Sequence, residues 1–320
     1  MTDTKTVNDD YRKEIPSRMQ YLFETTKWTD CQFLVGQEPI IETFDAHKLV
    51  LSLASPVFET MFHGALAEQG NAPIRIVDLE PDIFRKILQY MYTDKLSPNS
   101  IDVFKIYYGA NKYMLPKIKK QCTEYLKTNI DLNNVFDLYD FATFNDEADL
   151  MQSCKNMITL YADELLNKPS FLEIKLSTFI MILEQQAMNI SFELSLFRTL
   201  KAYAIKHGLV RRDHSSQENY RLLNLTETSA DETGNQTAVM KLQTKEPTID
   251  DALYRIRFLV IPVDDLANEL AGTSLLSLSE IGAILMNCLT RSSGFPMPAR
   301  FSVCRESRTR INKPVTSIRR

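Results

Sequence analysis

The stretch that decides the fold is residues 31–68, CQFLVGQEPIIETFDAHKLVLSLASPVFETMFHGALAE. It begins with two short β-prone runs, at residues 31–35 and 40–44, and the turn residues between them predict a hairpin. Residues 45–62 then follow a helical spacing that is interrupted before Pro56, where proline can open a second helix. The stretch therefore predicts two strands followed by two helices.

The end of this stretch differs from its core-facing part. The apolar spacing continues through Phe62, and Gly64 is then expected to stop or kink the helix. Leu66 and Glu68 follow two positions apart, and an apolar and an acidic side chain cannot both point into a core. A solvated helix end is the simple interpretation of this pattern, and a docking point for another protein is the alternative.

The elements outside this stretch predict two kinds of domain. Residues 16–27 read as a short helix, residues 74–77 as a third strand, and Pro81 opens another helix. From residue 98 to about residue 207 the spacing predicts helices only. Strands with helices, followed by a run of helices, indicate an α+β domain joined to an all-α domain.

The predicted boundaries follow from changes in composition along the chain. We expect a disordered N-terminus over residues 1–15, the α+β domain over 16–128, and the first part of the all-α domain over 129–210. Residues 211–250 are polar and read as a linker or an insertion, and residues 251–290 return to a helical spacing. Residues 291–320 are predicted to be a basic flexible tail, in preference to a nucleic-acid or membrane patch.

Composition limits the partners and the compartment. The formal net charge of -4 does not indicate binding to nucleic acid or to an anionic membrane. No apolar run approaches the roughly 20 residues that span a bilayer, and the polar opening residues do not resemble a signal peptide. Five widely spaced cysteines are typical of free thiols in a reducing compartment. We therefore expect a cytoplasmic protein, with the nucleus as the alternative.

The sequence contains none of the common catalytic, metal or cofactor motifs. Its four histidines form no HExxH or zinc-finger pattern, and CxxC, phosphate-loop and GxSxG motifs are missing. The best remaining catalytic candidate is the cluster of Asp45, His47 and Lys48. A structural interpretation is simpler, in which Asp45 caps the following helix and His47 packs beneath it. The prediction is a protein that is not an enzyme and that uses no cofactor or metal.

Ordered motifs over about the first 130 residues resemble the BTB (POZ) fold. They are WTDCQF at 28–33, DAHKLVL at 45–51, SPVF at 55–58, MF at 61–62, VDLEPDIF at 77–84, QYMYT at 89–93, ANKY at 110–113 and CTEYL at 122–126. The helices that follow resemble the BACK domain through KPSFLEI at 168–174, IL at 182–183 and FELSLF at 192–197, and RIRF at 255–258 resembles a further BACK element. Tyr203 stands where that domain commonly has tryptophan.

The spacing is most similar to the BTB-BACK proteins whose longer members end in a β-rich PHR domain. The residues after 289 show no sign of that domain, so the chain is expected to lack it. This resemblance implies an α+β BTB/POZ domain followed by an all-α BACK domain. It also implies a dimeric adaptor that binds cullin-3 through the BTB domain and recruits an unknown protein substrate for ubiquitination and proteasomal degradation.

The same resemblance assigns roles to particular residues. Leu66 and Glu68 fall on the family's cullin-binding motif, and Phe62 lies between the core and that contact. The dimer interface is expected to include Met19, Leu22 and Phe23 on the first helix, together with Asp30 and Lys48 near the dimer groove. The simpler alternatives are an intrachain contact for the helix face, a capping role for Asp30 and a surface position for Lys48.

Two other functions fit the same motifs. One is a BTB scaffold or transcriptional co-regulator without a ligase role, and the other is a short isoform that competes with full-length paralogues. In each case the predicted partners are proteins, including a second copy of the chain or a related BTB protein.

Overall fold

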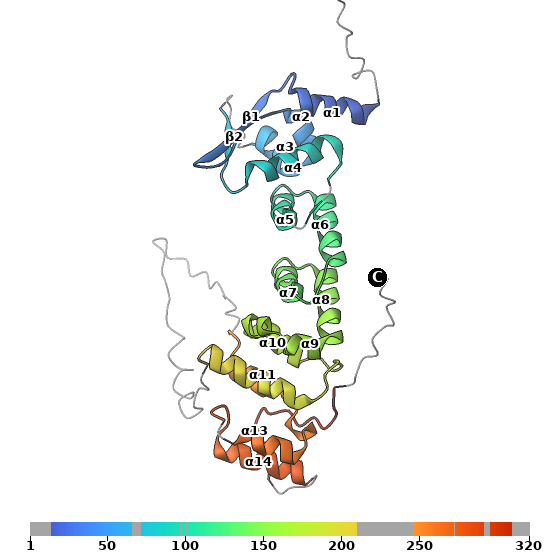
Figure 1. The fold of residues 1–320 in the computed structure, drawn as a ribbon. Helices are drawn as coiled ribbons and strands as arrows, with labels where there is room; N and C mark the ends of the chain where they lie inside the picture. Colours follow the sequence, from blue (N-terminus) through green and yellow to red (C-terminus); the bar gives the residue numbers. More distant parts are fainter. Residues whose placement is uncertain are drawn as a thin grey trace, which may run out of the picture. The chain divides into compact units, whose positions relative to one another are not determined.

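The chain folds into two compact units, Met1–Ile130 and Asp131–Arg320. The computed structural model describes residues 14–65, 72–96, 98–99, 101–209, 246–271, 273–290 and 295–308 (Figure 1). Each unit has its own core, and the division falls within two residues of the boundary that the sequence predicts at residue 128.

Unit 1 combines a small mixed sheet with helices. Its elements are α1 (Ile15–Thr25), β1 (Cys31–Gln37), β2 (Ile40–Ala46), α2 (Lys48–Ala54), α3 (Pro56–His63), β3 (Ile74–Ile76), α4 (Pro81–Thr93), α5 (Val103–Lys112) and α6 (Pro116–Thr128). The strand order is β2-β1-β3. β1 and β2 form the predicted antiparallel hairpin, whereas β3 runs parallel to β1. The α+β prediction is confirmed.

Aromatic side chains form the core of unit 1. The ring of Phe33 on β1 lies 5.6 Å from Phe58 and 5.4 Å from Phe84, between ring centroids, and Phe58 stacks on Tyr113 at 4.6 Å. Ser55 fixes the start of α3, because its hydroxyl donates to the carbonyl of Tyr113 at 2.7 Å and accepts from the amide of Phe58. The short SPVF motif therefore joins the helix start to the core.

Unit 2 contains helices and no strand among its described residues. Its helices, with η marking a 3-10 helix, are α7 (Val135–Phe144), α8 (Ala148–Leu160), α9 (Ala162–Leu166), η2 (Pro169–Glu173), α10 (Leu176–Leu183), α11 (Glu193–Lys206), α12 (Ile249–Leu253), η4 (Phe258–Val260), α13 (Val263–Leu270) and α14 (Leu278–Leu289). Tyr203 is buried, and its hydroxyl donates to the carbonyl of Ile174 at 2.8 Å. The all-α prediction for this half is confirmed.

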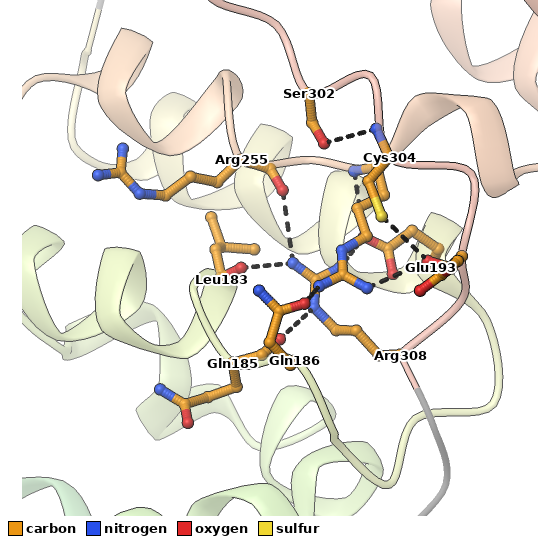
Figure 2. A network of polar contacts seen from close by, with 10 residues as sticks. Leu183, Gln185, Gln186, Glu193, Arg255, Ser302, Cys304 and Arg308 are labelled. Atoms are coloured by element: carbon orange, nitrogen blue, oxygen red, sulfur yellow. Dashed lines mark hydrogen bonds and ion pairs between the residues drawn. The ribbon is translucent and has the colours of Figure 1, made fainter.

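The segment at residues 295–308 differs from the predicted flexible tail. It has no helix or strand, yet Phe301 is buried with its ring 4.9 Å from Tyr254 and 6.0 Å from Phe258. Its last residue, Arg308, is buried in a network of polar contacts (Figure 2). Charge alone could not indicate this burial, because Phe301 and Arg308 make their contacts with residues that are distant in the sequence. We call residues 295–308 the C-terminal strap.

Other predicted segments fall partly outside the described residues. Residues 1–13, 210–245 and 309–320 are not described, so most of the N-terminus, the polar insertion and the end of the tail stay predictions. The predicted insertion ends earlier than residue 250, since α12 begins at Ile249 with a capping box between Thr248 and Asp251. None of the described helices combines the length and the apolar character needed to cross a membrane.

Candidate functional site

Three of the predicted site residues lie together where α2 begins. The carboxylate of Asp30 accepts a hydrogen bond from the backbone amide of Lys48, at 2.7 Å, and so caps α2. The ammonium of Lys48 lies 5.8 Å from the centroid of the Phe62 ring, within the range of a cation–π contact. The structure thus joins two predicted dimer residues to a predicted cullin-binding residue, and it shows the capping role that was the simpler alternative for Asp30.

Phe62 has an inner and an outer side. Its ring lies 6.4 Å from Phe33 and 5.9 Å from Phe58, so one side belongs to the core, while the Lys48 ammonium approaches the ring as well. The helix ends directly after it, with Gly64 as the C-cap, as the sequence predicts. Leu66 and Glu68 lie outside the described residues, and their roles stay predictions.

The predicted dimer face on α1 is half-buried. Met19, Leu22 and Phe23 are each partly exposed, and no residue of α1 is fully buried. Phe23 packs on Tyr92 of α4, with 5.6 Å between ring centroids, so the intrachain contact accounts for part of its burial. The remaining exposed area of α1 is available to a partner.

Sequence reasoning missed two apolar residues on the neighbouring helix. Leu49 and Leu53 of α2 are 69% and 81% exposed; Leu49 directly follows Lys48, and Leu53 lies about one helical turn further along. Both α1 and α2 pack against α4. The run KLVLSLA at residues 48–54 carries apolar residues on every side of the helix. The sequence therefore could not show which side faces the core and which side is exposed.

In the predicted catalytic cluster of Asp45, His47 and Lys48, the side chains of His47 and Asp45 make structural contacts. The two ring nitrogens of His47 lie 2.7 Å from the Tyr92 hydroxyl and 2.7 Å from the carbonyl oxygen of Lys27. The prediction that Asp45 caps α2 was wrong, since Asp45 lies in β2 and accepts from the Gln32 amide at 2.8 Å. The error arose because β2 extends through Ala46, and the capping carboxylate comes from Asp30 instead.

Burial raises the pKa of three thiols, one beside this site and two elsewhere in the chain. Burial raises the pKa of the Cys31 thiol to about 12, with a further increase from the Asp30 carboxylate and an opposing decrease from Lys48. Burial also raises the pKa of Cys122 and of Cys154 to about 12. In the part of the chain that the structure describes, no cluster of three or more histidine, cysteine or acidic residues could hold a metal ion.

Unit 2 contains a buried arginine cluster that the sequence did not reveal (Figure 2). The guanidinium of Arg308 donates to the backbone carbonyls of Leu183, Gln185 and Arg255 and pairs with the carboxylate of Glu193. Leu183 is the last residue of α10 and Glu193 the first of α11, so Arg308 joins the end of one helix to the start of the next.

A second arginine completes the cluster. The backbone amide of Arg257 donates to the same Glu193 carboxylate at 3.2 Å, and its guanidinium donates to the Gln186 side chain at 2.6 Å and to the carbonyl of Glu306 at 3.1 Å. Arg308 and Glu193 are 115 positions apart in sequence, so no local pattern could pair them. The cluster binds the strap to the rest of unit 2.

Comparison with known proteins gives two matching domain families and a set of relatives. The BTB/POZ domain family matches residues 19–130, and the family described as BTB And C-terminal Kelch (BACK) matches residues 135–220. Human BTB/POZ domain-containing protein 3 is 29% identical over 272 residues, which cover 85% of this chain and 47% of the relative. Human BTB/POZ domain-containing protein 6 is 28% identical over 275 residues, or 86% of this chain and 46% of the relative.

A fish relative gives the same result. BTB/POZ domain-containing protein 6-B of Danio rerio is 28% identical over 263 residues, which cover 82% of this chain and 49% of that protein. The chain therefore spans about half the length of the curated relatives that it matches.

Proposed function

Because the chain belongs to the BTB-BACK proteins, we propose that it is a non-enzymatic, dimeric adaptor that binds cullin-3 through unit 1 and recruits a protein substrate for ubiquitination. The observation that carries this proposal is the corner at the end of α3. There a half-buried Phe62 lies beside the Lys48 ammonium, and Leu66 and Glu68 follow Phe62 by four and six positions in the sequence.

The chemistry of this corner suits protein docking. A leucine that a partner buries fully contributes about 1.5 to 3 kcal/mol, and a neighbouring carboxylate can accept charge-assisted hydrogen bonds that orient the partner. Gly64 is the C-cap of α3 and precedes Leu66 by two positions in the sequence. The half-exposed Phe62 ring adds apolar area at the end of α3.

The direct test measures binding of the cullin-3 N-terminal domain to the full chain by calorimetry. We expect saturable binding, and we expect the Leu66→Ala, Glu68→Ala double variant to bind at least about 30-fold more weakly, which corresponds to about 2 kcal/mol. The matched control is Leu278→Ala, Glu124→Ala, which removes the same residue types from exposed positions on α14 and α6.

The outcomes separate the candidate functions. No binding of the unaltered chain at micromolar concentrations contradicts the adaptor proposal and favours a BTB scaffold or co-regulator. An equal loss of affinity in the control variant contradicts the assignment of Leu66 and Glu68 while leaving cullin binding itself in place.

Dimerisation is proposed to use the exposed apolar residues of α1 and α2. Met19 and Leu22 on α1 and Leu49 and Leu53 on α2 are apolar and incompletely buried. Light scattering coupled to size exclusion is expected to give twice the chain mass. The Leu49→Asp, Leu53→Asp variant is expected to be monomeric, because a charge in an apolar interface loses its hydration. Leu278→Asp is the control and should stay dimeric.

A further inference from the structure

A second surface of unit 1 is unassigned by the proposed function. It is a groove of about 790 Å³ formed by the β1–β2 turn, the residues that follow β3, the start of α4 and one side of α5. Its volume is in the range of clefts that bind ligands. We call it the hairpin groove.

The hairpin groove is separate from the corner at the end of α3. β3 runs parallel to β1, with Ile74 opposite Phe33 and Ile76 opposite Val35. β3 therefore begins at the Phe33 end of this pair, where the Phe62 ring of α3 also lies, 6.4 Å from the Phe33 ring between centroids. The groove lies beyond Val35, at the turn, and none of its lining residues belongs to α3.

The floor of the hairpin groove is apolar and exposed. Ile40 is 64% exposed, Val77 50%, Phe104 42% and Tyr108 50%. A single exposed apolar side chain is ordinary on a protein surface. Four of them lining one groove form a patch of the kind that marks an interaction site.

The rim of the same groove is acidic. Five carboxylates line it, and the single lining cation is Lys105, which is already paired with Glu80 at 2.7 Å. Asp78 is paired with Lys112 and accepts from the Tyr108 hydroxyl. Among the residues that the structure describes, Glu38 and Asp82 have no partner of opposite charge, so the rim has an excess of negative charge.

This combination of floor and rim selects a type of partner. The negative rim repels nucleic acid and anionic lipid, whereas lysine or arginine side chains pair with the free carboxylates while their apolar neighbours cover the floor. We propose that the hairpin groove docks a segment of another protein that carries both apolar and basic side chains. The groove gives the chain a second site for a protein partner.

The test uses a fluorescein-labelled 12-residue peptide of alternating leucine and lysine, with an otherwise identical leucine and glutamate peptide as its counterpart. Fluorescence anisotropy with the full chain is expected to show saturable binding of the lysine peptide only. Glu38→Lys, Asp82→Lys is expected to weaken that binding by about tenfold or more, and Phe104→Ala is expected to weaken it as well.

The matched control is Glu24→Lys, Glu124→Lys, which makes the same change in net charge on α1 and α6. It should alter the affinity by less than about twofold, because screening limits the effect of distant surface charges. All variants are compared at equal thermal stability, read from circular dichroism. Chemical shift changes in the NMR spectrum are expected at residues 36–40 and on α5.

Several results would overturn the proposal. They are equal binding of both peptides, an equal loss of affinity in the control variant, and shift changes confined to other surfaces. If the lysine peptide fails to bind while the chain self-associates in sedimentation, and Glu38→Lys, Asp82→Lys abolishes that association, then the occupant is a second copy and the proposal is wrong.

Discussion

Unit 2 contains a kind of ion pair that is not found among the described residues of unit 1. In unit 1 the paired charges keep contact with solvent, as in the Arg85–Glu42 pair, in which both side chains are about half exposed. In unit 2 the Arg308–Glu193 pair is almost completely buried (Figure 2). Exposed pairs contribute little to stability because water and salt screen them, whereas removing one partner of a buried pair leaves an uncompensated charge. The exposed pairs therefore cost little to lose, whereas the buried pair fixes Arg308 against the end of α10 and the start of α11.

The largest effect is expected for Arg308→Ala. The substitution leaves the Glu193 carboxylate and three backbone carbonyls without their donor, so the free energy of unfolding should fall by about 3 to 5 kcal/mol. Urea unfolding followed by circular dichroism measures the change.

The control for this prediction is Lys206→Ala, which removes the exposed pair with Glu173 and should cost no more than about 1 kcal/mol. Replacing both buried partners, with Glu193→Leu and Arg308→Leu, should recover only part of the loss, since the carbonyls stay unpaired. Similar values for Arg308→Ala and Lys206→Ala would remove the contrast between buried and exposed ion pairs.

The next largest effect compares the same substitution, glycine to alanine, in a tightly packed helix of unit 1 and in an open helix of unit 2. A methyl group added at Gly109 of α5 would clash with the Ile87 side chain, so Gly109→Ala should destabilise the protein by about 1 to 3 kcal/mol. The same change at Gly282 of α14 meets no atom within 4 Å and should stabilise that helix by about 0.5 to 1 kcal/mol. Differential scanning calorimetry should show changes in melting temperature of opposite sign.

A smaller effect is expected at the start of α2. Asp30→Ala removes the acceptor for the Lys48 amide and should cost about 1 kcal/mol, whereas Asp45→Ala removes only an exposed hydrogen bond to Gln32 and should cost less. Urea unfolding distinguishes the two variants. An equal loss would mean that Asp30 does not act as the cap.

The smallest effect concerns pH, and here the two units should behave alike. Cys122 in unit 1 and Cys154 in unit 2 have folded-state pKa values of about 12, against 9.0 for an exposed thiol. The unfolded chain therefore loses these protons first, so stability is complete below pH 9 and falls as the pH rises toward 12, by about 0.4 kcal/mol per thiol at pH 9. Cys122→Ala and Cys154→Ala should each flatten this slope in urea unfolding. If neither variant changes the slope, other titrating groups cause the loss of stability at high pH.

Much of the fold could be predicted because local and global signals agree in unit 1. The β-prone runs, the SPVF helix start and the helical spacing after Pro81 each produced the expected element. The assignment of Asp45 as the cap failed because the end of β2 depends on pairing with β1, which reaches Ala46 opposite Cys31. Exposure of Leu49 and Leu53 was equally invisible, since an apolar helix shows its free face only when its packing partners are known.

By itself, the sequence determined the order of domains, the helix stop at Gly64 and the positions of the motif residues, since these depend on local spacing and on backbone preferences. Only the tertiary structure decided that the C-terminal strap packs on unit 2. It also decided that Asp30, Lys48 and Phe62 meet, and that five carboxylates surround one apolar groove. The physical reason is that burial and charge pairing are properties of distant residues brought together, as Arg308 and Glu193 show across 115 positions.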